Sequence, residues 1–359
     1  MTNFRNFKMV DYVVFGKGCF SQLQTIIEPQ RKNKDPFIFF VDHFFEKASP
    51  QDTDFLVKNI PLKNNDQIIF IDVTDEPKTS VVDALTQQIK NEFGNISGII
   101  GIGGGSVLDL TKAVSLMMNN PGSSADYQGW DLVKYPGVYK VGIPTISGTG
   151  AEVSRTTVLT GPTKKLGMNS DFTPFNQIIL DPNLLKTVPV NQRFYTGMDC
   201  YIHCIESLQG TYLNEFSKSY GEKALELCQQ VFLHKKTWDE KSDELLMMAS
   251  YFGGMSIAYS QVGIAHAVSY GLSYLLGTKH GIGNCIVMEH IEEFYKQGVV
   301  EYKKMVAQNN IYIPQNITAK LSDDDFEKMM AVSLNMKPLW ENALGLHWQT
   351  IMTKEKLLS

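Results

Sequence analysis

One aspartate and three histidines in the second half of the chain have the types and spacing of metal ligands. Asp199 and His203 are four residues apart in a segment of helical pattern, which we expect to begin near Gly197, so both side chains should share one helix face. His266 and His280 follow further along the chain. Three imidazoles and one carboxylate suit Fe²⁺, Zn²⁺ or a neighbouring divalent ion, and they leave a coordination position open. Spacing alone also fits a surface ion pair with two unrelated core histidines.

A glycine-rich loop in the first half of the chain could bind a phosphate group. Gly103, Gly104, Gly105 and Ser106 separate an apolar, strand-like run from a segment of helical pattern. Glycines let a backbone approach a pyrophosphate closely, and the first N–H groups of a helix are unpaired and point at the ligand. The loop therefore favours a dinucleotide site, although a tight strand-to-helix turn without a ligand has the same pattern.

Two further stretches could complete a dinucleotide site. A second polar turn carries Thr145, Ser147 and Thr149, whose hydroxyl groups suit a phosphate-bearing ligand. In the common dinucleotide fingerprint an acidic residue follows the glycines by about twenty positions. Here the best acidic candidate, Asp42, precedes the loop and ends another predicted strand. Asp42 can reach a ribose if its strand lies beside the strand that leads into the glycine-rich loop.

The secondary-structure pattern divides the chain of 359 residues into two parts. Apolar runs alternate with helical segments in the first part, which is typical of βαβ units and a parallel sheet. These runs are continuous, so both faces of the sheet should be covered. We expect an α/β Rossmann-like dinucleotide-binding domain over residues 1–183 and an all-helical metal-binding domain over residues 184–359.

The predicted elements follow from these patterns. Strands are predicted at residues 12–15, 37–41, 67–71, 98–102, 141–143 and 177–180. Helices are predicted at residues 80–93, 108–118, 201–209, 217–233, 243–259 and 265–276, with a further capped helix start at Ser322.

Composition and charge exclude several classes of protein. The net charge of −5 comes without a basic stripe, so a nucleic-acid partner is not expected. No apolar run is long enough to cross a membrane, and the first residues lack the apolar core of a secretory signal, so we expect a cytoplasmic protein. The five cysteines show no CxxC spacing, which argues against a disulfide framework. Cys200 and Cys204 are expected to be buried.

Several motifs resemble those of the iron-containing alcohol dehydrogenase family, and the resemblance covers nearly the whole chain. In the first part it rests on Phe15-Gly16-x-Gly18, Gly103-Gly104-Gly105-Ser106-x-x-Asp109-x-x-Lys112, Pro144-Thr145-x-x-Gly148-Thr149-Gly150-x-Glu152 and Asp181-Pro182. The most specific motifs lie in the second part, at Gly197-Met198-Asp199-x-x-x-His203 with Glu206, at Ala265-His266 and at His280-Gly281.

The resemblance implies a fold, cofactors and a role for several of these residues. It implies a Rossmann-like domain followed by a helical domain, and NAD and one divalent metal as cofactors. The implied metal ligands are Asp199, His203, His266 and His280. The residues implied to line NAD are Gly103 to Ser106, Thr145, Ser147 and Thr149, with Lys165 near the nicotinamide ribose and Asp42 as the acidic residue that favours NAD.

The chain departs from the family pattern at two places. Many members carry a histidine four residues after the third ligand, where this chain has Tyr270, our candidate catalytic residue. The C-terminal part, with Trp340 and Trp348, also lacks the usual ending. Both features resemble the branch that oxidises C8 of 3-deoxy-manno-octulosonate, a sugar acid of lipopolysaccharide biosynthesis. For such a substrate, Arg155 or Lys279 could meet the carboxylate.

The expected function is oxidation of a primary alcohol to an aldehyde by hydride transfer to NAD, with the metal as a Lewis acid. Three alternatives remain: a general short-chain alcohol dehydrogenase or aldehyde reductase, a lyase similar to dehydroquinate synthase that returns the hydride within each turnover, and a sensor that binds without catalysis. The expected partner is a small alcohol or sugar acid, with no nucleic acid and no membrane, and a homodimer is a possible assembly.

Overall fold

The computed structural model describes residues 8–47, 54–63, 65–74, 76–235 and 237–358. Contacts within the chain divide it into two compact units. Unit 1 comprises Met1–Ile146 and Ala151–Val188, and unit 2 comprises Ser147–Gly150 and Pro189–Ser359. The main division thus follows Val188, whereas the sequence placed the boundary after residue 183.

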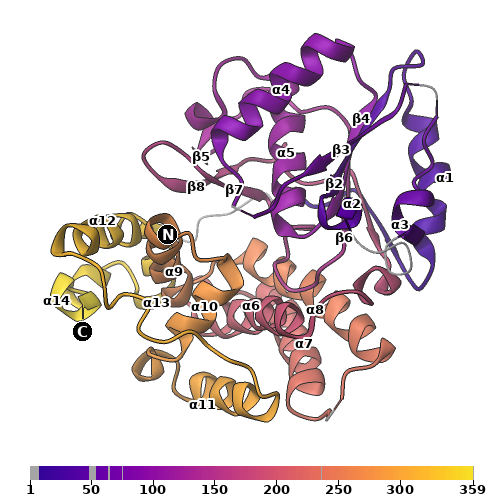
Figure 1. The fold of residues 1–359 in the computed structure, drawn as a ribbon. Coiled ribbons are helices and arrows are strands. Elements are labelled where there is room, and N and C mark those ends of the chain that lie inside the picture. The colour runs from indigo at the N-terminus through magenta and orange to yellow at the C-terminus, as the bar shows by residue number, and fades with distance from the viewer. Residues whose placement is uncertain (1–7, 48–53, 64, 75, 236, 359) are drawn as a thin grey trace. The chain divides into compact units, whose positions relative to one another are not determined.

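Unit 1 is built on a six-stranded sheet with the order β1-β9-β6-β4-β2-β3, in which every neighbouring pair is parallel (Figure 1). Its strands are β1 (Tyr12–Phe15), β2 (Phe37–Asp42), β3 (Gln67–Ile71), β4 (Gly98–Gly103), β6 (Lys140–Pro144) and β9 (Gln177–Leu180). All six predicted strands are confirmed, with bounds that differ by one residue at most. The predicted α/β Rossmann-like class of this part is confirmed as well.

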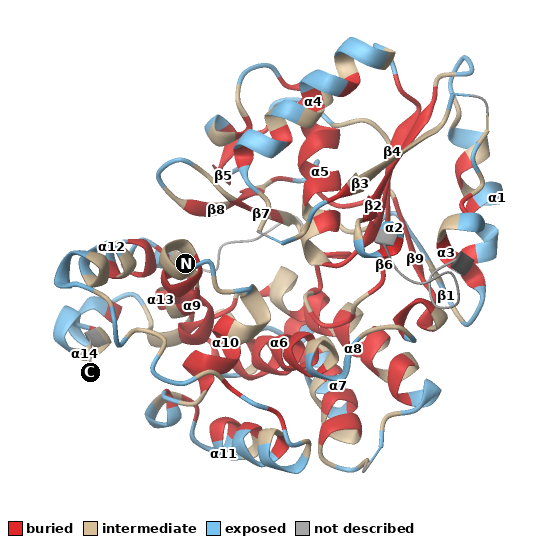
Figure 2. Cartoon of the chain, in the orientation of Figure 1, coloured by how far each residue is buried: buried red, intermediate tan, exposed pale blue. Residues whose placement is uncertain are grey.

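Helices cover both faces of this sheet. The helices of unit 1 are α1 (Leu23–Ile27), α2 (Phe44–Lys47), α3 (Asp54–Lys58), α4 (Thr79–Phe93) and α5 (Gly105–Asn119), with short 3₁₀ helices at Cys19–Gln22, Glu28–Gln30, Ser124–Tyr127 and Pro182–Leu185. Phe40 of β2 belongs to a core cluster with residues of α4 and α5. Its neighbour Phe39 belongs to a second cluster with residues of α1 and α3. Every residue of β2 and β4 is therefore buried, as their continuous apolar pattern predicts (Figure 2).

The strand order of the sheet reverses between β2 and β4. From β2 the chain passes to β3 at one edge, whereas from β4 it continues through β6 to β9 in the opposite direction. In open α/β sheets, ligands bind beyond the carboxyl ends of the strands at such a reversal. Val41 pairs with Ile102, so Asp42 and the glycine-rich loop leave adjacent strand ends at this position. The condition for Asp42 to reach a ribose is thus met.

A second sheet, of three strands, was missed by the sequence patterns. It contains β5 (Gly129–Trp130), β7 (Thr156–Thr160) and β8 (Lys165–Asn169) in the order β5-β8-β7. These strands are short and carry threonine, lysine and glycine, so neither an apolar run nor a clean alternation marks them. Buried Lys112 of α5 attaches this sheet to the helix, because its Nζ donates to the Thr156 carbonyl at 2.8 Å.

Unit 2 is helical in the part of the chain that the structure describes. Its helices are α6 (Val190–Gln209), α7 (Glu215–Phe232), α8 (Glu240–Tyr259), α9 (Ile264–Leu276), α10 (His280–Met288), α11 (Glu292–Gln308), α12 (Asp323–Leu334), α13 (Lys337–Leu344) and α14 (Lys354–Leu358), with a 3₁₀ helix at Trp348–Thr350. Ser322 caps α12 as predicted, since its Oγ accepts the N–H of Asp325. Cys200 and Cys204 are buried free thiols, also as predicted. Among the described helices, none combines the length and apolar character needed to cross a bilayer.

The prediction that a helix begins near Gly197 is wrong. Helix α6 begins at Val190, so Asp199 lies in its middle rather than in its first turn. A glycine inside a helix costs about 0.5–1 kcal/mol relative to alanine, which made this position resemble a helix start. Here the glycine is needed for packing, because a Cβ at position 197 would lie 2.4 Å from the Phe232 ring.

Candidate functional site

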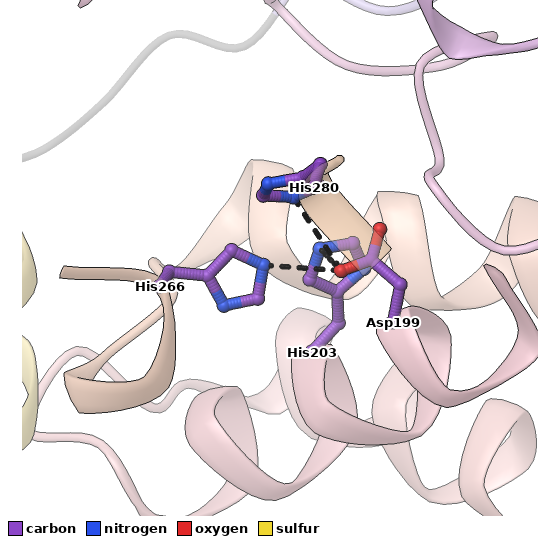
Figure 3. A group of neighbouring side chains, drawn as sticks. All are labelled: Asp199, His203, His266 and His280. Atoms are coloured by element: carbon purple, nitrogen blue, oxygen red, sulfur yellow. Dashed lines mark ion pairs between the residues drawn. The ribbon is translucent and has the colours of Figure 1, made fainter. Parts of the chain in front are cut away.

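Three helices of unit 2 bring the four predicted metal ligands together (Figure 3). Asp199 and His203 come from successive turns of α6, His266 from the first turn of α9, and His280 is the first residue of α10. One ligand atom of each residue lies within 4.8 Å of the others. Oδ1 of Asp199 lies 3.6, 3.3 and 3.5 Å from the Nε2 atoms of His203, His266 and His280, respectively.

These distances fit a divalent metal. Ligand atoms that are about 2.0–2.2 Å from a tetrahedral ion are roughly 3.4 Å apart, which is close to the separations observed around Asp199. The side chains of Asp199, His203 and His266 are almost fully buried, but that of His280 is 27% exposed. The cluster is therefore accessible from the side of His280, which a catalytic metal site requires.

The charges within the cluster favour a cation. Burial alone would raise the pKa of Asp199, but the three neighbouring histidines hold its pKa well below its usual range. Burial lowers the pKa of His203 to about 4. At neutral pH Asp199 is thus an ionised carboxylate and His203 a neutral imidazole. These are the protonation states that bind metals. For His266, burial lowers the pKa, but the charges of Glu206 and Asp199 outweigh burial and raise it to about 9.

The glycine-rich loop of unit 1 has no room for a side chain at Gly103 and little room at Gly104. A Cβ at Gly103 would lie 2.6 Å from Cγ2 of Val107, and one at Gly104 would lie 3.1 Å from Cδ1 of Ile146. Helix α5 begins at Gly105, within the glycine-rich loop, so its unpaired N–H groups lie at the carboxyl edge of the sheet. Ser106 is the second residue of this helix. The packing of the loop against Val107 and Ile146 explains the glycines, and its role as a phosphate cradle stays a prediction.

Two predicted cofactor residues lie at the same edge of the sheet. The N–H of Thr145 donates to the Gly103 carbonyl at 3.0 Å, which joins the second polar turn to the glycine-rich loop. Asp42 is buried at the end of β2, and its Oδ1 accepts the N–H of Phe44 at 3.0 Å. The structure thus brings Asp42, Gly103 and Thr145 together at the strand reversal.

The remainder of the polar turn, Ser147–Gly150, belongs to unit 2. Gly148 has φ +139°, and a Cβ there would lie 1.6 Å from the carbonyl oxygen of Thr196 on α6. Glycine is therefore required at this close approach to the helix that carries Asp199. Oγ of Ser147 is buried and has no hydrogen-bond partner within the described ranges. Such a hydroxyl is suited to a bound ligand.

Comparison with known proteins identifies the family. The family model "Iron-containing alcohol dehydrogenase" matches residues 11–182, and the model "Fe-containing alcohol dehydrogenase family, C-terminal" matches residues 193–337. The chain belongs to the iron-containing alcohol dehydrogenase family. It is accordingly an oxidoreductase that acts on CH–OH groups, as the motifs predicted.

Individual relatives agree with this assignment. The iron-type dehydrogenase described here is 26% identical to alcohol dehydrogenase 4 of Schizosaccharomyces pombe over 80% of this chain and 68% of that protein. It is 28% identical to the NAD-dependent methanol dehydrogenase of Bacillus methanolicus over 80% of this chain and 75% of the relative. Its fold is similar to the crystal structure of sulfoacetaldehyde reductase from Bifidobacterium kashiwanohense in complex with NAD⁺, with a TM-score of 0.78, 21% identity, and coverage of 99% and 96% of the two chains.

Two further residues contact the predicted ligands: Glu206, which belongs to a family motif but was given no role, and Asn284, which the sequence reasoning missed. Oε2 of Glu206 accepts from Nδ1 of His266 at 2.5 Å. Nδ2 of Asn284 donates to Oδ1 of Asp199 at 2.7 Å and lies 3.0 Å from Nε2 of His266. The spacing could have indicated both, because Glu206 follows His203 by three residues and Asn284 follows His280 by four, so each shares a helix face with a ligand.

Tyr270 lies beside two of the predicted metal ligands. Its ring centroid is 5.7 Å from that of His280 and 6.4 Å from that of His266. The side chain therefore points toward the ligand cluster, as expected for a residue four positions after His266 on one helix. A catalytic role of its hydroxyl group stays a prediction.

The predicted basic residues of the dehydrogenase lie in different surroundings. Lys279 is exposed and immediately precedes His280. The guanidinium of Arg155, in contrast, pairs with Asp131 at 2.6 Å and Asp171 at 2.8 Å. Its charge is thus already matched by two carboxylates, which makes Lys279 the better candidate for a substrate carboxylate.

Lys165, predicted near the nicotinamide ribose, is the first residue of β8. Its side chain is buried, and its ammonium group forms an ion pair with Glu76 within unit 1. A contact between Lys165 and the cofactor of the dehydrogenase stays a prediction.

Proposed function

We propose that this iron-type alcohol dehydrogenase oxidises a primary alcohol to an aldehyde by hydride transfer to NAD, with one divalent metal, Fe²⁺ or Zn²⁺, held by Asp199, His203, His266 and His280. The observation that carries the proposal is the separation of 3.3–3.6 Å between Oδ1 of the aspartate and the three Nε2 atoms. When bound, the metal supplies a Lewis acid for the substrate oxygen and NAD supplies the hydride acceptor.

The residues of unit 1 would bind and orient the dinucleotide. The first N–H groups of α5 would donate to its pyrophosphate, since no side chain occupies the glycine-rich loop. Asp42 would accept hydrogen bonds from ribose hydroxyl groups and repel a 2′-phosphate, which selects NAD over NADP. Thr145, Ser147 and Thr149 would add hydroxyl contacts, and Lys165 would lie near the nicotinamide ribose.

The residues of unit 2 would bind the alcohol on the accessible side of the cluster. His280 is the exposed ligand, and Tyr270 packs against it, so the substrate would approach along the side of the cluster that these two side chains form. The phenol of Tyr270 can both donate and accept a hydrogen bond, so it would hold the substrate hydroxyl or a water molecule. It would thereby position the reacting carbon.

For the substrate, we propose the C8 hydroxyl of 3-deoxy-manno-octulosonate, in lipopolysaccharide sugar biosynthesis. Two features support a sugar acid. Tyr270 replaces the histidine that many family members carry, and Lys279 places a positive charge immediately beside the exposed ligand His280. A simple short-chain alcohol is the second candidate, because the relatives include a methanol dehydrogenase.

A turnover experiment tests both levels of the proposal. The protein is stripped of metal, reloaded with Fe²⁺ or Zn²⁺ without oxygen, and assayed for NADH with the sugar acid, with its methyl ester and with 1-propanol. We expect NADH to accumulate with the sugar acid, and kcat/KM to fall for the ester, which lacks the carboxylate charge. Equal values for acid and ester would overturn the sugar-acid assignment. Absence of NADH with every alcohol would overturn the dehydrogenase function, since a lyase returns its hydride in each turnover.

A further inference from the structure

Glu206 is a buried acid on the helix that carries the first two ligands, and it contacts the third ligand from behind. Its Oε2 accepts from Nδ1 of His266 at 2.5 Å, and both side chains are at most 1% exposed. We propose that Glu206 is a positioning residue that fixes the ring orientation and tautomer of His266 and thereby sets the affinity of the site for metal. This inference rests on the metal site of the proposed function.

Both carboxylate oxygens of Glu206 are used. While Oε2 accepts from the ring, Oε1 accepts the backbone N–H of Ala265 at 2.6 Å and that of His266 at 3.4 Å. These N–H groups belong to the first turn of α9, where a negative charge is stabilised by the helix dipole. The carboxylate therefore holds the backbone and the ring of His266 at once.

The space around the carboxylate is restricted. A Cβ at Gly263 would lie 3.3 Å from Oε1 of Glu206 and 2.4 Å from the hydroxyl oxygen of Tyr295. That hydroxyl also accepts the N–H of Ile264 at 3.2 Å. The start of α9 is thus packed closely on the acid.

The contact also determines which ring nitrogen can bind metal. An ionised carboxylate only accepts hydrogen bonds, so the His266 ring keeps its proton on Nδ1 when it loses the proton on Nε2 to bind a metal. The lone pair then lies on Nε2, the atom that is 3.3 Å from Oδ1 of Asp199. Carboxylates that accept from a metal-binding histidine orient the ring and raise its donor strength, and losing one typically costs about 10- to 100-fold in metal affinity.

His203, the predicted ligand histidine on α6, lacks such support. Nδ1 of His203 is buried and has no hydrogen-bond partner in the part of the chain described by the structure. The rings of His203 and His266 are stacked, with their centroids 4.7 Å apart. The two neighbouring rings differ in the hydrogen-bond partner of Nδ1, which is Glu206 for His266. The contribution of Glu206 is therefore specific to His266.

Glu206→Gln is the sharpest test, because a glutamine has one acceptor oxygen where the structure uses two. Either the ring or the α9 backbone then faces an N–H donor, and a donor facing Nδ1 moves the ring proton to Nε2. Glu301→Gln is the matched control. Glu301 accepts from the Tyr201 hydroxyl at 2.8 Å and from Gln229 at 3.0 Å, so it also contacts α6 but supports no ligand.

The measurements separate a metal effect from a folding effect. The dissociation constant for Zn²⁺ is measured by chelator competition, the visible spectrum is recorded with Co²⁺, and the unfolding of metal-free protein is followed by circular dichroism. We expect Glu206→Gln to weaken Zn²⁺ binding about 10- to 100-fold and to change the Co²⁺ spectrum, with NAD affinity retained. Glu301→Gln should keep the wild-type dissociation constant and spectrum.

A purely structural role predicts another result. If Glu206→Gln lowers the stability of the metal-free protein but keeps the wild-type Zn²⁺ affinity and Co²⁺ spectrum, the inference is overturned. If the glutamine variant fails to fold, Glu206→Asp provides the test. Its side chain is one methylene shorter, so its carboxylate cannot hold Nδ1 of His266 at the same distance. Weaker Zn²⁺ binding by that variant supports the inference, and wild-type binding overturns it. Failure of the wild-type protein to bind Zn²⁺ at all would instead overturn the proposed metal site.

Discussion

The carboxyl edge of the sheet in unit 1 and the ligand cluster in unit 2 are built in different ways. The edge is made of backbone: consecutive glycines leave space, and the first N–H groups of α5 point out of it. The cluster is made of side chains from three separate helices, and all of them except His280 are buried. Added side-chain volume should therefore disturb ligand binding at the sheet edge, whereas loss of a single donor atom should disturb metal binding at the cluster. Defects in the two regions should therefore be separable, with NAD affinity reporting on one and metal content on the other.

The largest effect is expected from His280→Ala. Loss of a residue that only hydrogen-bonds to a ligand, such as Glu206, lowers metal affinity roughly 10- to 100-fold. Loss of one of the four ligands themselves should lower metal affinity further, and turnover should fall below detection. NAD affinity should be nearly unchanged, because the loop of unit 1 is untouched. Metal content by elemental analysis, kcat and NAD binding check this expectation. His290→Ala, an exposed histidine ten positions further on, is the control. Near-normal metal content in His280→Ala would contradict the site.

The second effect concerns cofactor choice at the sheet edge. Asp42→Gly removes a carboxylate whose charge-assisted contact with a ribose is worth about 1.5–3 kcal/mol, or ten- to hundred-fold. The ratio of kcat/KM with NAD to kcat/KM with NADP should fall about ten- to hundred-fold. Metal content should stay at the wild-type level. Asp42→Asn keeps an acceptor for the N–H of Phe44 and removes only the charge, so it separates repulsion of a phosphate from local structure. Equal use of NAD and NADP by the wild-type chain would show that Asp42 has been misassigned.

The space in the glycine-rich loop can be tested with Gly103→Ala. The added Cβ would lie 2.6 Å from Cγ2 of Val107, so the first turn of α5 must shift. Overpacking of this kind costs about 1–3 kcal/mol, and we expect NAD affinity to fall by about ten-fold. Calorimetric titration with NAD measures the loss. Unchanged affinity would mean that the loop does not hold the cofactor closely, whereas lost metal would mean that the two regions are not independent.

The same difference explains how much the sequence could predict. The glycine-rich loop and its flanking strand and helix are contiguous, so local pattern was sufficient to locate them. The metal cluster needs the packing of α6, α9 and α10, and residue spacing could pair Asp199 with His203 but not with His266 or His280. The family resemblance supplied that grouping, which the structure then brings together.

The misses have identifiable physical causes. Gly197 weakens the helix pattern in the middle of α6, and only the packed ring of Phe232 explains it. Strand β7 carries threonines that show no apolar run, and it is held by Lys112, a buried lysine whose role depends on contacts distant in sequence. The support of His266 by Glu206 is likewise a tertiary contact between helices.

The smallest effect is expected at the rim of the cluster, where Tyr270→Phe removes one hydroxyl group and keeps the ring. If the hydroxyl positions the substrate or a water molecule, kcat/KM should fall about ten-fold or more, or about 1.4 kcal/mol, because a hydrogen bond to the reacting group is lost. Metal content, NAD affinity and the unfolding temperature should stay unchanged, since the ring contacts with His266 and His280 remain. The other explanation is that Tyr270 only packs against the ligands. In that case phenylalanine would support wild-type turnover and leucine would not, because leucine lacks the ring. If the phenylalanine variant is as active as the wild type, the hydroxyl group has no role in the reaction, and the Tyr270 ring only packs against His280.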